Sequence, residues 1–220
     1  MCIRGNIKND FRMFYFQARN IKQVFFIPLI LILVVLPLVL FASMKKYQDI
    51  YYVEESLMLF GQYIIPVLST WWFSFAFIEL IDNEGNELFY VTSRMKNNLV
   101  LLWLGLYLAV IGVVYGIIGI WVNIAPWEFV RVAICSCFYI FLEYAIMFWS
   151  GSMTLSFLVT ILYWLATTFG SQIKVDWLNC YDNNFMTIEL LKEKYMWVLL
   201  VAITFYAIGC IGNARKDRYN

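Results

Sequence analysis

Long apolar runs, separated by short polar segments, are the feature that most limits what this chain can fold into. Residues 25–43 form the first run and contain no charged side chain. Inside a bilayer the backbone N–H and C=O groups find no water, and a helix bonds all of them within one segment. About 20 apolar residues are enough to cross the hydrocarbon core. The sequence therefore predicts an all-α integral membrane protein.

Six runs have the length and hydrophobicity of transmembrane helices, and they make residues 1–220 a single transmembrane domain. The expected spans are 25–43, 57–80, 99–123, 129–150, 155–170 and 196–213. The composition agrees, because 63% of the residues are hydrophobic and 14% are charged. A soluble domain is about half apolar and a quarter charged. The net charge of +1 gives no reason to expect a nucleic-acid partner.

The distribution of Lys and Arg predicts that both termini are cytoplasmic. With the amino terminus inside, ten of these cations fall in cytoplasmic segments and five in outer segments. Cytoplasmic loops carry the excess of Lys and Arg in membrane proteins. The residues before the first span lack the apolar core of a cleavable signal peptide, so we expect this span to be its own insertion signal.

Residues 7–22 are expected to form an amphipathic helix at the inner membrane surface. Apolar residues recur with helical spacing at Ile7, Phe11, Phe14, Ala18 and Ile21. Cations follow one position later, at Lys8, Arg12, Arg19 and Lys22. A basic helix with one apolar stripe lies in the plane of a membrane interface. The alternative is an ordinary charged flank to the first span.

Residues 81–98 are the one sizeable cytoplasmic loop of this topology. Acids gather at its start and cations at its end, which suits the dipole of a short helix. Leu88, Val91 and Met95 would then form an apolar stripe. The pattern indicates either a short helix that docks on another protein or a solvated loop. Residues 171–195 form an outer loop rich in apolar residues, for which short re-entrant helices are expected.

Small residues mark one face of the third span, at Gly105, Ala109, Gly112, Gly116 and Gly119. Their alternating steps of four and three place them on a single helical seam, where another helix can approach closely. We expect this seam to pack inside one subunit, in preference to forming an interface between two subunits.

Glu143 lies within the fourth span, where an ionisable side chain is costly and is a functional candidate by default. The interpretation we favour is a structural hydrogen bond to a Ser, Thr or Tyr of a neighbouring helix. The alternative is a proton relay in a secondary carrier, which commonly uses more than one buried ionisable group.

The order of these segments resembles the membrane subunit of ABC transporters of the type-2 permease family. The sequence Glu84-Gly85-Asn86-Glu87-Leu88, followed by Val91 and Arg94, is similar to the acid-Gly-x-Glu-x-Leu pattern of that family's coupling region. The resemblance implies that this loop contacts a separate ATP-binding subunit, which carries the ATP and magnesium. It also implies a second permease subunit, as an identical or related chain, and a bacterial plasma membrane.

The chain itself is not expected to be an enzyme. It contains no GxxxxGK[ST] element for binding phosphates and no histidine. Its five cysteines do not form a metal-binding set, so no cofactor or metal is expected here. The expected function is therefore a permease subunit of an ATP-driven exporter for an amphipathic or apolar cargo, such as a peptide toxin, antimicrobial peptide, drug or lipid. The alternative is a proton-coupled secondary transporter that uses Glu143.

Overall fold

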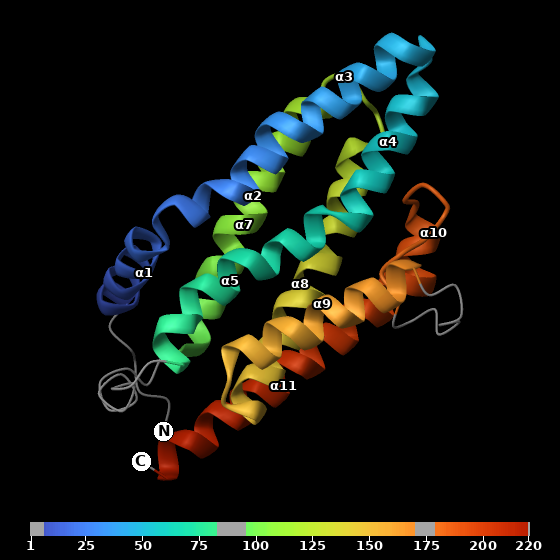
Figure 1. Ribbon diagram of the computed structural model, residues 1–220. Helices are drawn as coiled ribbons and strands as arrows, with labels where there is room; N and C mark the ends of the chain where they lie inside the picture. Colours follow the sequence, from blue (N-terminus) through green and yellow to red (C-terminus); the bar gives the residue numbers. More distant parts are fainter. Residues whose placement is uncertain (1–6, 83–95, 170–178, 220) are drawn as a thin grey trace.

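The computed structural model describes residues 7–82, 96–169 and 179–219, and every regular element in these ranges is helical (Figure 1). The first elements are α1 (Ile7–Ile21), the 3-10 turn η1 (Lys22–Phe25), α2 (Phe26–Ile30), the π-helical turn η2 (Leu31–Val35) and α3 (Leu36–Tyr47). The middle elements are α4 (Ile50–Tyr63), α5 (Ile65–Ile81), α7 (Lys96–Ile118) and α8 (Ala125–Ser150). The last elements are α9 (Met153–Phe169), α10 (Ile188–Leu190), the π-helical turn η3 (Leu191–Tyr195) and α11 (Met196–Tyr219).

Four helices in the described ranges are long and apolar enough to cross a membrane. They extend over Phe26–Tyr47, Asn97–Ile118, Ala125–Ser150 and Ile188–Ala214. They correspond to the first, third, fourth and sixth expected spans. The second expected span is divided between α4 and α5, and the fifth corresponds to the shorter apolar helix α9. The crossing of the membrane by these two segments remains a prediction.

Prolines explain the two irregular places in the first half of the bundle. Pro37 has no N–H to donate to the carbonyl of Leu33, and the helix widens into the π-helical turn η2 just before it. Pro66 follows the junction at Ile64, where α4 ends and α5 begins. The Ile64 and Leu68 N–H groups keep helical hydrogen bonds across this junction, to the carbonyls of Phe60 and Ile64.

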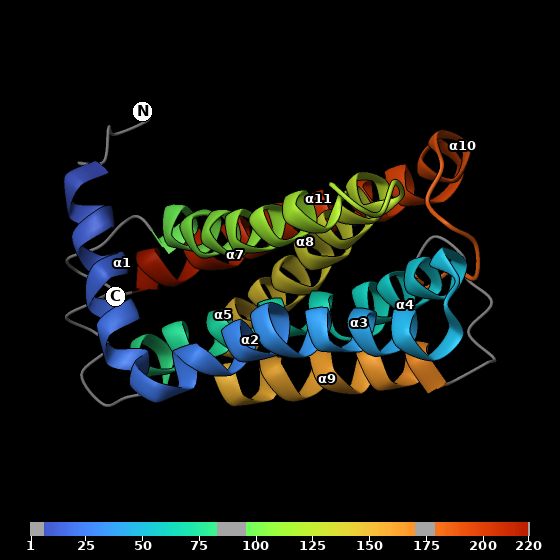
Figure 2. The ribbon, with the colours of Figure 1, turned by 90° about the horizontal axis from the view of Figure 1, so that it is seen from above.

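Helix α8 is the central element, and α4, α5, α7, α9 and α11 all pack against it (Figures 1 and 2). Its longest contact is with α11. At Gly209 of α11 the two helices approach so closely that the ring of Tyr144 occupies the space a side chain would take. The hydroxyl of Tyr144 donates a hydrogen bond to Asn97 of α7, which fixes the ring between three helices.

Helix α1 lies across the end of α5 and the start of α7 (Figure 2). The sequence predicted this helix, but its packing is more specific than that of a helix resting on a membrane surface. Gln17 is buried, donates to the carbonyl of Ala76 at 3.1 Å and accepts from the indole of Trp103 at 2.9 Å. Phe14 packs on the same indole, with ring centroids 4.7 Å apart.

Of the three positions of the predicted stripe whose side chains are described, one differs from the expectation. Phe14 and Ala18 pack on the core, whereas Phe11 is 55% exposed. Arg12 and Arg19 are exposed as well. The backbone of Lys22 belongs to η1.

We predict that Gly209→Ala destabilises the protein, whereas Gly105→Ala does not. A Cβ at Gly209 would lie 2.2 Å from Cδ1 of Tyr144, whereas a Cβ at Gly105 meets nothing within 4 Å. Overpacking of a core costs about 1–3 kcal/mol. In both variants the replacement of Gly by Ala gains about 1 kcal/mol of helix propensity. The difference between their stabilities therefore measures the contact with Tyr144. Thermal unfolding of the purified variants in detergent measures it, and equal midpoints would contradict the prediction.

Candidate functional site

Glu143, in the second half of α8, joins three helices. Its side chain is fully buried, and Ser74 of α5 donates a hydrogen bond to its Oε1 atom. Its backbone carbonyl accepts a second hydrogen bond from Ser156 of α9. Its Oε2 atom has no hydrogen-bond partner among the described residues. The bond to Ser74 is of the kind expected for a structural carboxylate.

The ion pairs found in the described ranges lie at the end of the bundle where α8 begins, away from Glu143. They join Arg131 to Glu128 and Lys194 to Asp182. A proton relay through Glu143 would therefore have to run without a charged neighbour in the described part of the chain.

Glu128 and Arg131 form a fully buried ion pair on the first turns of α8, with 3.4 Å between Oε2 and Nε. Both side chains also hold the segment 179–187, which we call the outer cap after the side of the membrane that the sequence predicts for it. Glu128 accepts from the N–H of Met186 at 2.8 Å, and Arg131 donates to the carbonyl of Asn184 at 2.5 Å. The guanidinium of Arg131 also lies over the ring of Tyr195, 5.4 Å from its centroid. A buried charge is costly unless it is paired and hydrogen-bonded, and the outer cap supplies one hydrogen bond to each member of the pair. Oε2 of Glu128 and Nε and Nη1 of Arg131 have no hydrogen-bond partner among the described residues.

Two other helical elements also hold the outer cap. Gln62 of α4 accepts from the N–H of Asp182 at 2.7 Å. Lys194 of η3 pairs with the Asp182 carboxylate at 3.0 Å, and Tyr195 donates to the carbonyl of Cys180 at 3.1 Å. Burial raises the pKa of the Asp182 carboxyl, but the N–H of Asn184 and the ammonium of Lys194 outweigh it, so the pKa lies below its ordinary value.

The sequence analysis missed this site. It placed no site at Glu128, and it treated the segment 171–195 as one loop. The last helix instead begins at Ile188, and the cap before it has no helical residues in the range 179–187. The available signal was an acid and a cation three residues apart at the start of an otherwise apolar helix.

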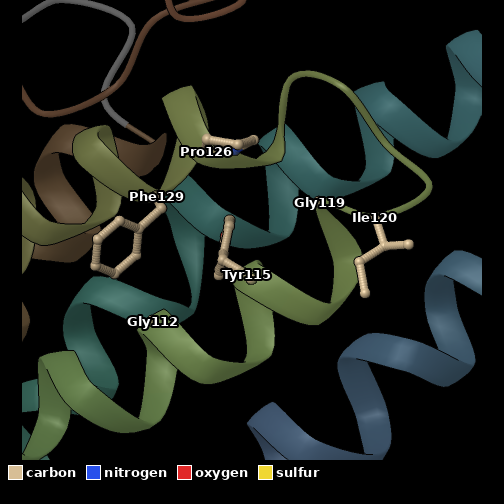
Figure 3. Close-up of a pocket in the computed structure, with 7 residues that line it drawn as sticks. Gly112, Tyr115, Gly119, Ile120, Pro126 and Phe129 are labelled. Carbon is tan, nitrogen blue, oxygen red and sulfur yellow. The ribbon is translucent and has the colours of Figure 1, made fainter.

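The seam of small residues on α7 packs within the chain at only two of its five positions. A Cβ on Gly112 would contact Phe129 at 3.5 Å, and one on Gly119 would lie 3.6 Å from Pro126. Gly105, Ala109 and Gly116 are exposed instead, and a groove of about 330 Å³ runs beside the last of them (Figure 3). Packing inside one subunit was therefore the wrong expectation for these three residues.

The residues expected to couple to an ATPase lie outside the described residues. They are Glu84, Gly85, Glu87, Leu88, Val91 and Arg94. The described flanks of this segment are the end of α5 and the start of α7. Asp82, at the end of α5, accepts hydrogen bonds from the N–H groups of Met153 and Thr154 and so fixes α5 to the start of α9.

No group of three or more His, Cys, Asp or Glu side chains that could hold a metal occurs among the residues that the structure describes. Comparison with known proteins found no matching family, curated protein or solved structure. What can be said of function therefore depends on the residues and contacts of the chain itself.

We predict that Arg131→Met destabilises the protein by about 3–5 kcal/mol, because it leaves the carboxylate of Glu128 buried without its cation. Glu128→Leu combined with Arg131→Met should be more stable than Arg131→Met alone, because no charge then remains buried. Lys192→Met, at an exposed cation near the same end, is the control. Thermal unfolding and protease cleavage within 179–187 measure the effect. An Arg131→Met variant as stable as the wild type would show that the pair does not hold the cap.

Proposed function

We propose that the chain is the membrane-spanning subunit of an ATP-driven exporter, similar to the type-2 permeases of ABC transporters. The observation that carries the proposal is the acid-Gly-x-Glu-x-Leu pattern from Glu84 to Leu88, placed in the segment that connects α5 to α7. The contacts of Gln17 with Ala76 and Trp103 support it. They join α1 to the same two helices, so a force applied to the connecting segment reaches three helices together.

In this proposal the chemistry takes place on a partner. An ATP-binding cassette subunit binds ATP and magnesium and presses on the connecting segment, while this chain catalyses no reaction. The segment lies on the cytoplasmic side, together with both termini, in a bacterial plasma membrane. A second permease subunit, identical or related, completes the pathway. The exposed face of α7 at Gly105, Ala109 and Gly116 has the small residues that close helix pairing in a membrane uses.

An amphipathic or apolar cargo fits the interior better than an ion or a sugar does. The buried core is dominated by aromatic and aliphatic side chains, and Glu143 is the one fully buried acid described away from the outer cap. A sugar or ion would need a path lined by polar groups. Peptide toxins, antimicrobial peptides, drugs and lipids are the cargo classes that meet this condition.

Recovery of a partner ATPase tests the proposal directly. The tagged protein is purified from its native membranes in mild detergent, bound proteins are identified, and ATPase activity is assayed. We expect an ATPase with a phosphate-binding loop in stoichiometric amount, lost in Glu84→Arg/Glu87→Arg. Glu54→Arg/Glu55→Arg, the same charge reversal at the other end of the bundle, should retain it. Recovery of the tagged protein from its native membranes without an ATPase would contradict the proposal.

The fully buried carboxylate of Glu143 is the observation that favours a second candidate function, that of a proton-coupled secondary transporter. For the exporter we predict that Glu143→Gln keeps stability and transport, because the amide oxygen still accepts from Ser74. Ser74→Ala should cost more, about 1–3 kcal/mol, because the buried carboxylate loses its donor. Thermal midpoints and proton flux in reconstituted vesicles measure both variants. A stable Glu143→Gln protein that has lost proton-driven uptake would establish the carrier instead.

A further inference from the structure

An apolar groove of about 370 Å³ lies at the outer end of the first membrane-crossing helix, between α3, α4 and the end of α7. Leu40, Val53 and Val122 are buried and form its floor. Its rim consists of exposed apolar residues, which are Phe41, Met44, Ile117 and Trp121. All ten lining residues are apolar, and the groove is open to the surroundings of the bundle.

The position of the groove places it in the outer leaflet. On α3 its wall extends from Pro37 to Met44, a rise of seven residue steps or about 10 Å along a helix. Half of a hydrocarbon core is about 15 Å thick. Trp121 is 80% exposed at the upper rim, as is typical of an aromatic ring anchored at the membrane interface. The groove therefore starts near the headgroups and descends through most of one leaflet.

The wall chemistry selects among possible occupants. A peptide would bury backbone N–H and C=O groups against residues that offer no hydrogen-bond partner, at several kcal/mol per group. A hydrocarbon chain has no such groups, and it gains contact along both sides of the groove. The occupant that fits the lining is an acyl chain.

Charged residues at the end of the groove near Met44 and Val53 indicate which headgroup the bound lipid carries. Lys45 and Lys46 follow directly after Met44 on α3, and both are exposed. Glu54 and Glu55 follow directly after Val53 on α4. In the described ranges no ion pair joins these cations to these acids. The two lysines suit a phosphate, and the two carboxylates suit a primary ammonium that donates charge-assisted hydrogen bonds.

We propose that this groove is a binding site for an aminophospholipid of the phosphatidylethanolamine class in the outer leaflet. One acyl chain fills the groove between α3 and α7, Lys45 and Lys46 bind the phosphate, and Glu54 and Glu55 bind the ammonium group. The site requires that Phe26–Tyr47 crosses the membrane and that its Tyr47 end lies on the outer side, as the distribution of Lys and Arg predicts. The site does not depend on the exporter function. Failure of the pull-down experiment would therefore leave the lipid proposal standing, and failure of the lipid experiment would leave the exporter proposal standing.

Photolabelling of the full chain in nanodiscs tests the site. The nanodiscs contain equal amounts of phosphatidylethanolamine and phosphatidylglycerol, with one of the two lipids bearing a diazirine in its acyl chain. We expect phosphatidylethanolamine to label residues 37–53 and 117–122, about tenfold more than phosphatidylglycerol does, as for one lost pair of charge-assisted contacts. Equal labelling by both lipids, or uniform labelling of all lipid-facing helices, would overturn the proposal.

Variants distinguish the part of the site that binds the acyl chain from the part that binds the headgroup. Met44→Trp and Ile117→Trp narrow the groove from exposed rim positions and should reduce labelling, whereas Leu38→Trp, exposed on α3 outside the groove, should not. Glu54→Gln/Glu55→Gln should remove the preference between the two lipids, whereas Glu189→Gln/Glu193→Gln, exposed acids at the same end, should preserve it. Loss of labelling when the chain pairs with a second copy would assign the groove to that copy and overturn the lipid site.

Discussion

The polar contacts of α8 are the constraint on which the rest of the bundle depends. In a helix surrounded by other helices in an apolar medium, a buried ionisable side chain is costly unless a neighbour forms a hydrogen bond with it. At one end of α8, Glu128 and Arg131 require the outer cap, and toward the other end Glu143 requires Ser74 of α5. These contacts fix where α5 and the cap lie relative to α8. The apolar surfaces then pack around positions that the polar groups have already set.

The helices themselves could be predicted from the sequence, because hydrophobic length alone determines them in a membrane. The runs around residues 25–43, 99–123, 129–150 and 196–213 became helices of the expected kind. The start of the last helix could not be predicted in the same way. Glu189, Lys192, Glu193 and Lys194 have the composition of a polar loop, but in the helix three of them face outward and Lys194 binds the cap.

The candidate sites were predicted less well, because they depend on which helix faces pack against each other. The seam that begins on α7 has the spacing of a packing face, but only Gly112 and Gly119 of it contact other parts of the chain. A closer approach occurs at Gly209 of α11, where Tyr144 fills the space of a side chain. Glycine spacing shows where a helix can approach and does not show which helix does. The same limit applies to α1, whose stripe predicted the helix but not the contacts of Gln17 with α5 and α7.

The outer cap is held largely through its main chain. The carbonyls of Cys180 and Asn184 and the N–H groups of Asp182 and Met186 are bound by side chains of the surrounding helices. Among the side chains of the cap, Asp182 pairs with Lys194, and Cys180 and Met186 are buried in the core. The side chains of Asn183 and Asn184 are exposed and lie outside these contacts. Such exposed residues can change, and so meet different molecules, while the backbone of the cap stays in place.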